Sequence, residues 1–139
     1  MNADWMRTIE AVESRAGGGL FLRWSDGAEA EVALPKAFAR RSGEVSVGDW
    51  GHSIVWPDGT ELGADTLWLE TLSAIGRGDA RQFLEWRLAN GLSLARAADE
   101  LGLSRRTVAY YSNGTRAVPK AIQLACKGWD ATHPTRKAA

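Results

Sequence analysis

Hydrophobic and polar residues alternate in the first half of the chain with the period of two that is typical of β-strands. Between residues 28 and 34, small or apolar side chains occupy every second position, and Glu29 and Glu31 lie between them. The preceding segment 20–24 is rich in β-forming residues, and the Asp-Gly pair at 26–27 is a turn signal. The pattern predicts a hairpin with one buried face and one solvated face.

Further strand-like segments extend this β-rich region to about residue 62. Ile9 and Val12 indicate a first strand, and the glycine run 17–19 interrupts the chain after it. The pattern Trp-x-Asp-Gly occurs at 24–27 and again at 56–59, which predicts a tight turn at both places. The other expected elements are a short helical turn at 35–41, a strand around Val45 and Val47, a turn at 48–51 and a return strand at 52–56.

After Asp65 the hydrophobic period changes to that of amphipathic helices. Asp65 is the predicted N-cap of a helix at 65–75. The sequence Gly-Arg-Gly-Asp at 76–79 predicts a domain boundary or hinge, and a helix from about Asp79 to Asn90 follows. The first helix is expected to bury Leu67, Trp68, Leu72 and Ile75, and the second to bury Phe83, Leu84, Arg87 and Leu88.

Three more helices are expected after Gly91. Ser93 caps the first and Ser104 caps the second. Gly102 supplies the bend between them, because glycine adopts the left-handed conformation without penalty. Asn113-Gly114 ends the second helix, and Pro119 opens the third. The apolar positions at helical spacing are Leu94, Ala97, Ala98 and Leu101, then Val108 and Tyr111, then Ile122, Ala125, Cys126 and Trp129.

Charge divides the chain into two halves of opposite sign. Residues 1–75 contain 6 Lys+Arg and 12 Asp+Glu, whereas residues 76–139 contain 11 Lys+Arg and 5 Asp+Glu. This asymmetry indicates that one half contacts nucleic acid and the other does not. With the periodicity, it predicts an α+β chain: a β-rich domain at 1–76 closed by the helix near 65–75, and a helical domain at 77–139 with a basic C-terminal tail.

Residues suited to catalysis or metal binding are sparse. Cys126 is the only cysteine, so no intrachain disulfide can form, and its apolar helix face favours a buried thiol. His52 and His133 lack zinc-ligand spacing, and the glycine run 17–19 lacks the lysine of a phosphate-binding loop. We expect no enzymatic activity, no metal and no cofactor. Because neither a secretory signal nor a membrane-span-length apolar run is present, we expect a cytoplasmic location.

The segment 91–119 carries several motif residues at fixed spacing: Gly91-Leu92-Ser93, Ala97-Ala98, Leu101-Gly102-Leu103-Ser104, Thr107-Val108, Asn113-Gly114 and Pro119. Through them, residues 80–130 resemble the lambda-repressor-like (Cro/repressor, XRE-type) helix-turn-helix family. The first half resembles a group of small bacterial β-rich domains of unknown function, through the segments 56–59 and 64–67. Such domains are sometimes fused to this type of helix-turn-helix.

The resemblance implies that the helix at 104–113 enters the major groove of DNA and presents Arg105 and Arg106 to base edges. Positive charge at a helix N-terminus opposes the helix dipole, which favours a functional reason for this pair. Tyr110 either contacts a thymine methyl or a phosphate, or packs at the helix edge. The small Ala109 permits close approach to bases. The other implied contacts, mostly to phosphates, are Ser104, Thr107, Asn113 (alternatively a simple C-cap), Arg96, Arg116 and Lys120.

One position departs from the family pattern. The family often has Gln at the start of the bracing helix, where it helps to clamp a phosphate, and here that position is Leu94. Either Arg96 takes over the contact with the DNA backbone, or this protein docks somewhat differently.

The sequence therefore predicts a sequence-specific DNA-binding transcriptional regulator, acting as a repressor or autoregulator. Members of the resembled family usually dimerise on palindromic DNA, so we expect a homodimer on a palindromic operator. An antitoxin-like protein, which binds a partner protein through its acidic N-terminal domain and autoregulates its operon, is the main alternative. A small-ligand sensor in the first domain, or a helix-turn-helix serving only as a protein scaffold, are further alternatives.

Overall fold

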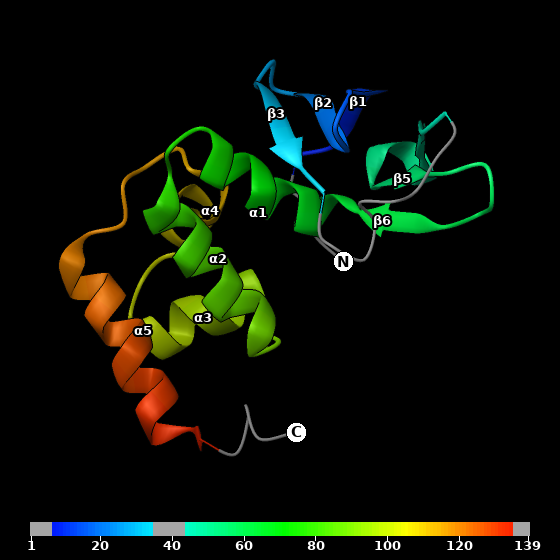
Figure 1. The fold of residues 1–139 in the computed structure, drawn as a ribbon. Coiled ribbons are helices and arrows are strands. Elements are labelled where there is room, and N and C mark those ends of the chain that lie inside the picture. Colours follow the sequence, from blue (N-terminus) through cyan, green and yellow to red (C-terminus); the bar gives the residue numbers. More distant parts are fainter. Residues whose placement is uncertain (1–6, 35–43, 135–139) are drawn as a thin grey trace. The chain divides into compact units, whose positions relative to one another are not determined.

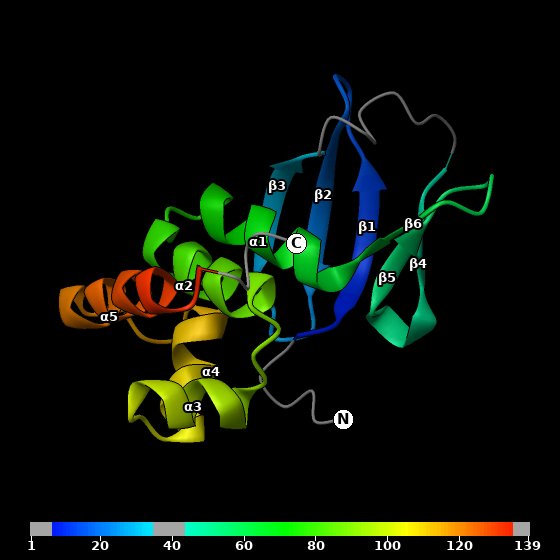
Figure 2. The same cartoon turned by 90° about the horizontal axis from the view of Figure 1, so that it is seen from below.

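The computed structural model describes residues 7–34 and 44–134. Antiparallel strands come first and five α-helices follow, which confirms the expected α+β class (Figures 1 and 2). Contacts along the chain separate it into two compact units that divide between Gly76 and Arg77. We call these the sheet unit and the helical unit. The predicted helical turn at 35–41 and the basic tail from 135 onward lie outside the described residues.

The first sheet of the sheet unit contains β1 (Ile9–Ser14), β2 (Gly19–Trp24) and β3 (Glu29–Ala33), antiparallel and in that order. In the β2–β3 hairpin, Leu20 pairs with Val32, and Leu22 pairs with Ala30. These four residues are buried, whereas the glutamates at 29 and 31 are exposed. The predicted hairpin and its buried face are therefore confirmed.

A second antiparallel sheet contains β4 (Ser46–Gly48), β5 (Ser53–Val55) and β6 (Glu61–Gly63). A 3-10 turn, Asp49–Gly51, joins β4 to β5, at the place where the sequence predicts a turn. The strand β4 lies one residue after the expected position, and β5 is shorter than the return strand expected at 52–56. The sequence pattern does not distinguish β6, because an alternation cannot be recognised over three residues.

Two Asp-Gly turns of the sheet unit have the same geometry. Gly27 and Gly59 have φ values of +91° and +88°, and their amides donate to the carbonyl oxygens of Trp24 and Trp56 at 2.9 Å in both cases. The aspartate before each glycine accepts a hydrogen bond from the amide two positions later. The recurring pattern therefore corresponds to a repeated tight turn, as predicted.

Helix α1 (Ala64–Ala74) completes the core of the sheet unit. The indole N–H of Trp24 donates to Thr71 Oγ1 at 3.1 Å, and the rings of Trp24 and Trp68 meet edge to face at 4.9 Å. Leu67 and Leu72 are fully buried, as the period predicts. Residues in β2 and α1 thus share one apolar core.

Two expectations for α1 are wrong. The N-cap is Gly63, because β6 runs directly into the helix, and Asp65 lies within the first turn, where it accepts from the amide of Thr66. Ile75 is 47% exposed, since the helix has already ended at Ala74 and the chain has turned away from the core.

The helical unit contains α2 (Gly78–Ala89), α3 (Leu94–Leu101), α4 (Arg105–Asn113) and α5 (Lys120–Thr132). Aromatic rings join three of these helices. Phe83 meets Tyr111 at 5.4 Å and Trp86 meets Trp129 at 5.6 Å, both edge to face. Arg87 is buried as its position on the apolar face predicts, and burial lowers the pKa of its guanidinium to about 10.

Helix α5 buries less than its sequence period suggests. Cys126 and Trp129 are buried, but Ala125 is exposed and Ile122 is half-buried. The expectation that all four line one buried face is wrong for Ala125, because α5 contacts the unit along a narrow stripe. None of the described helices is long and apolar enough to cross a membrane.

Candidate nucleic-acid interface

A tight turn joins α3 to α4. The residues in and beside this turn explain its conformation. Ser93 Oγ accepts from the amide of Arg96 at 3.0 Å, and Ser104 Oγ accepts from the amide of Thr107 at 3.0 Å. Gly102, in the turn, has a left-handed φ of +70°. These caps and the glycine bend confirm the predicted start of each helix and the break between them.

One side of α4 is buried and the other is open. Val108, Tyr111 and Ser112 are buried, and α4 packs against α2 and α3. Arg105 and Arg106, at the first two positions of the helix, are both exposed. The N-terminal end of α4 therefore presents two guanidinium groups to solvent, although a helix dipole disfavours positive charge at that end.

The side chains of Ser104 and Thr107 also bond to each other. Ser104 Oγ donates to Thr107 Oγ1 at 2.9 Å while it accepts from the Thr107 amide. Both hydroxyls lie beside the two exposed arginines at the start of the helix. The structure thus brings Ser104, Arg105, Arg106 and Thr107 together at one end of α4.

The other end of α4 carries a second group of candidate residues. The guanidinium carbon of Arg116 lies 4.7 Å above the ring of Tyr110, a cation–π contact. Asn113 Oδ1 accepts from the amide of Thr115 at 2.9 Å, and Gly114 has a left-handed φ of +79°. Asn113 thus orders the turn that ends the helix. Ala109 is half-buried.

Arg77 and Asp79 connect this end of α4 to the start of α2, and the sequence analysis missed them. Arg77 Nε and Nη2 donate to the two carboxylate oxygens of Asp79 at 3.1 and 3.2 Å. Arg77 also donates to the carbonyl oxygens of Gly114 and Arg116, the latter at 3.1 Å. Asp79 in turn accepts from the amide of Val118 at 2.8 Å. We call this pair the Arg77–Asp79 clamp.

The clamp fixes the chain between α4 and α5. Asp79 accepts hydrogen bonds from Arg77 and from the Val118 amide. These bonds hold the pKa of its carboxyl at about 2, below the ordinary value. The sequence suggested only a boundary or hinge here. The backbone groups that Arg77 and Asp79 bind lie 37 to 39 residues later in the chain. No local sequence pattern can therefore indicate the clamp.

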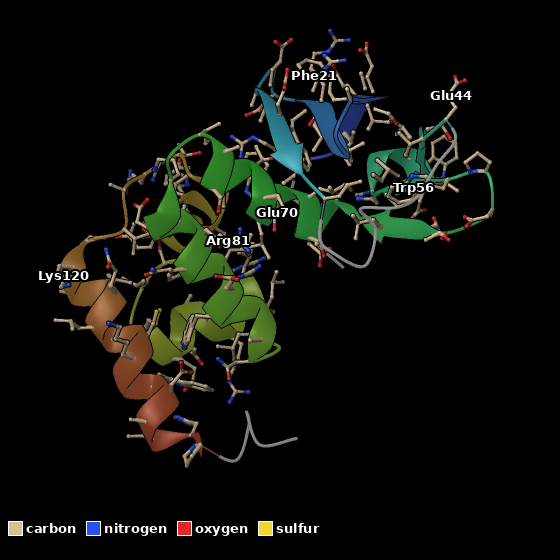
Figure 3. The ribbon with its side chains drawn as sticks, viewed as in Figure 1. Phe21, Glu44, Trp56, Glu70, Arg81 and Lys120 are labelled. Atoms are coloured by element: carbon tan, nitrogen blue, oxygen red, sulfur yellow. The ribbon has the colours of Figure 1, made fainter. Side chains whose placement is uncertain are left out.

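Two of the remaining candidate residues lie on neighbouring helices. Arg96 Nε donates to Glu100 Oε2 at 3.1 Å, and Glu100 also accepts from the indole N–H of Trp129 at 2.6 Å. These bonds lower the pKa of Glu100 and link α3 to α5. Lys120 is exposed at the first position of α5 (Figure 3).

Leu94, at the position where the resembled family often has Gln, is buried. Its side chain is therefore part of the core and cannot bind a phosphate. Arg96 is a cationic residue of α3 two positions after Leu94. Its side chain is half-exposed and is paired with Glu100 of the same helix.

The chain matches no protein-family model and no curated protein. It is similar to a protein of known crystal structure from Nitrosomonas europaea ATCC 19718, named "Putative DNA Binding Protein NE0471". The two share 35% sequence identity with a TM-score of 0.62, over 100% of this chain and 96% of that chain. The similarity thus includes both the sheet unit and the helical unit.

Proposed function

Since this chain belongs to the same family as the Nitrosomonas europaea protein NE0471, we propose that it binds double-stranded DNA and regulates transcription. In this proposal, α3 and α4 act as a helix-turn-helix of the lambda-repressor-like type, and α4 enters the major groove. The name of the relative supports DNA binding. The role as a sequence-specific regulator rests on the residues of α4.

The observation that carries the proposal is the exposed pair Arg105 and Arg106 at the N-terminus of α4. Their charge is unfavourable beside the helix dipole, and both side chains are exposed to solvent. A guanidinium can donate two hydrogen bonds to O6 and N7 of guanine. In a helix-turn-helix, the N-terminal residues of the second helix contact the bases.

The other candidate residues have supporting roles in this proposal. The hydroxyls of Ser104 and Thr107 bind a phosphate next to the arginines. At the far end, Arg116, held on Tyr110, contacts the DNA backbone. Lys120 and Arg96 add electrostatic attraction without reading sequence.

Because one such unit covers little DNA, we propose that a homodimer binds a palindromic operator. Light scattering of the protein with and without a palindromic duplex tests the stoichiometry. Two chains per duplex are expected. One chain per duplex at saturation would contradict the proposed dimer.

The DNA-binding proposal is tested by mobility shift on the DNA upstream of the protein's own gene, across a salt series and against scrambled competitor. Replacing Arg105 and Arg106 together by Ala should abolish the preference for one sequence, because the base contacts are lost. The matched control replaces Arg15 and Arg23, two arginines of the sheet unit, by Ala. The control removes the same charge and should retain the preference. Unchanged affinity and preference in the Arg105/Arg106 variant would overturn the assignment of α4.

We also propose that the sheet unit binds a partner protein, as an antitoxin-like protein would. Trp50 is 94% exposed, and it and the preceding Asp49 have left-handed φ values of 56° and 48°. Residues other than glycine rarely adopt this backbone conformation, because it is strained. Binding of a partner protein to the exposed indole would explain why a strained tryptophan occupies this position. Co-purification from the native host tests this proposal. Wild type should retain a stoichiometric protein that the Trp50→Gly variant loses.

A further inference from the structure

Arg116, one of the proposed contacts to the DNA backbone, lies in the segment 114–119 that joins α4 to α5. Arg116 is exposed, and its guanidinium carbon lies 4.7 Å above the ring of Tyr110. Its amide donates to the carbonyl oxygen of the same tyrosine at 3.3 Å. An arginine that is already ordered loses less conformational entropy on binding a phosphate than a freely moving one does. The placement of this segment therefore affects how well Arg116 can bind DNA.

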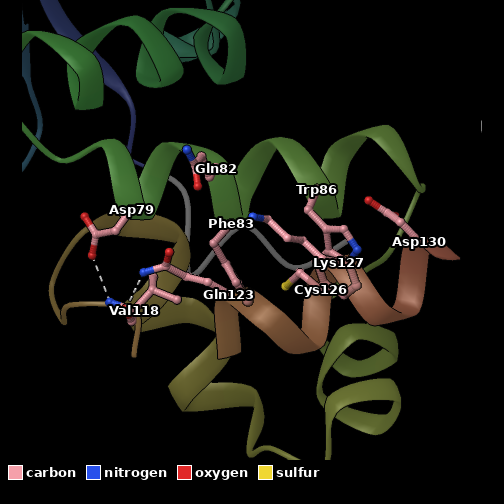
Figure 4. A pocket seen from close by; sticks show the side chains of 9 residues that line it. All are labelled: Asp79, Gln82, Phe83, Trp86, Val118, Gln123, Cys126, Lys127 and Asp130. Carbon is pink, nitrogen blue, oxygen red and sulfur yellow. Dashed lines mark hydrogen bonds between the residues drawn. The ribbon is translucent and has the colours of Figure 1, made fainter. Parts of the chain in front are cut away.

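Hydrogen bonds from the Arg77–Asp79 clamp hold this segment at three alternate residues. Arg77 donates to the carbonyl oxygens of Gly114 and Arg116. Asp79 accepts from the amide of Val118 at 2.8 Å (Figure 4). The last four residues of the segment belong to no helix or strand. Their conformation therefore depends on these side-chain hydrogen bonds rather than on secondary structure.

The positive charge of Arg77 is balanced inside the clamp. Two of its nitrogens bond the Asp79 carboxylate at 3.1 and 3.2 Å, and the side chains of Arg77 and Asp79 are only 28% and 24% exposed. The guanidinium is thus committed to a carboxylate and to backbone carbonyl oxygens, which leaves it poorly placed to bind a phosphate itself. It can, however, fix the backbone before and after Arg116.

We propose that Arg77 and Asp79 are positioning residues for DNA binding: they hold the segment 114–119 so that Arg116, stacked on Tyr110, meets a DNA phosphate. They act through Arg116 and make no DNA contact of their own. This role rests on the proposed DNA-binding function, and it adds to that function two residues that lie outside the helix-turn-helix motif.

The direction of one mutational effect separates positioning from simple electrostatics. Asp79→Asn removes a negative charge from the unit that binds DNA, so electrostatics alone predicts tighter binding to the phosphates. If the clamp positions Arg116, the variant should instead bind more weakly, by a factor on the order of ten in about 0.1 M salt, which is the effect of one lost phosphate contact. The matched control Asp99→Asn removes the same charge from an exposed position on α3 and should bind at least as tightly as wild type.

Fluorescence anisotropy of a labelled duplex that carries the DNA upstream of the protein's own gene, titrated across a salt series, measures the affinity and the number of phosphate contacts. Arg116→Ala should lower the slope of log affinity against log salt by about 0.9, and Asp79→Asn should lower it by a similar amount. In the double variant the two losses should not add, because the clamp acts through Arg116. Circular dichroism checks that each variant is folded at the assay temperature.

Two results would overturn the positioning role while DNA binding stands: additive losses in the double variant, or equal DNA affinities of Asp79→Asn and Asp99→Asn. Should Asp79→Asn not fold, Arg77→Gln removes the same hydrogen bonds and takes its place in the test of additivity. Failure of the wild-type protein to bind the duplex would overturn the proposed function and, with it, the positioning role.

Discussion

Single residues hold the end of α4 more firmly than the sequence suggests. The Arg77 guanidinium reaches Asp79 and two backbone carbonyls, and the Asp79 carboxylate reaches the Val118 amide. Charge-assisted hydrogen bonds of this kind are about twice as strong as neutral ones. The clamp also orders the turn carrying Arg116, which stacks on Tyr110. Its contribution to stability should therefore be measurable both as a mutational effect and as a dependence on pH.

Replacing Asp79 by Asn should lower the free energy of unfolding at pH 7 by about 1 to 2 kcal/mol, because the ionised clamp is lost. The folded-state pKa of Asp79 is about 2, below its ordinary value of 3.8. Since the folded pKa is the lower one, its stabilisation is complete above about pH 4 and is lost as pH falls toward 2. Urea unfolding between pH 2 and 7 checks this. The wild type should lose more stability across that interval than Asp79→Asn, and parallel curves would contradict the linkage.

At the scale of elements, α4 combines two tasks in nine residues. Its buried side, Val108, Tyr111 and Ser112, fixes the helix against α2 and α3. Its exposed N-terminus carries the arginine pair, and the side chain of Ser104 caps the amides there. A short helix depends strongly on its caps, because few internal hydrogen bonds hold it. Stability and DNA affinity can therefore be separated by changing the cap alone.

Ser104→Ala should lower the free energy of unfolding by about 1 kcal/mol, because the amide of Thr107 loses its acceptor. Ser104→Asp retains a cap and adds a negative charge that the helix dipole favours, so its stability should match or exceed that of wild type. The same charge repels phosphate, and we expect weaker DNA binding. Thermal melts and mobility shifts on both variants check the two effects. Wild-type DNA affinity in Ser104→Asp would contradict a phosphate near this cap.

At the scale of the whole molecule, the chain consists of two units with separate cores and opposite charge. The sheet unit has Trp24, Leu67 and Leu72 at its centre, and the helical unit has Leu84 and Val108. The acidic residues concentrate in the first half and the basic ones in the second. We expect the two cores to respond independently when one of them is damaged.

Leu72→Ala should destabilise the sheet unit by about 2 to 5 kcal/mol, and Leu84→Ala should do the same to the helical unit, since both side chains are fully buried. Amide hydrogen exchange should show lost protection confined to residues before 77 in the first variant and after 76 in the second. DNA binding should weaken only in Leu84→Ala. Loss of protection across both units in either variant would indicate one cooperative structure.

The sequence alone determined the features that depend on neighbours along the chain. Caps at Ser93 and Ser104, left-handed glycines at 102 and 114 and the alternation in β3 are local, because each involves residues within a few positions. The candidate residues of α4 were implied by the resemblance to the lambda-repressor-like helix-turn-helix family. Their exposure at the helix start follows from the buried period of the remaining helix.

Features that depend on residues far apart in the chain could be seen only in the folded structure. The N-cap of α1 moved to Gly63 because β6 runs into the helix, and Ala125 is exposed because α5 packs along a narrow stripe. The Arg77–Asp79 clamp arises where the start of α2 meets a segment about 40 residues later in the chain. The physical reason is that packing and hydrogen bonding across such separations depend on three-dimensional placement, which no periodicity encodes.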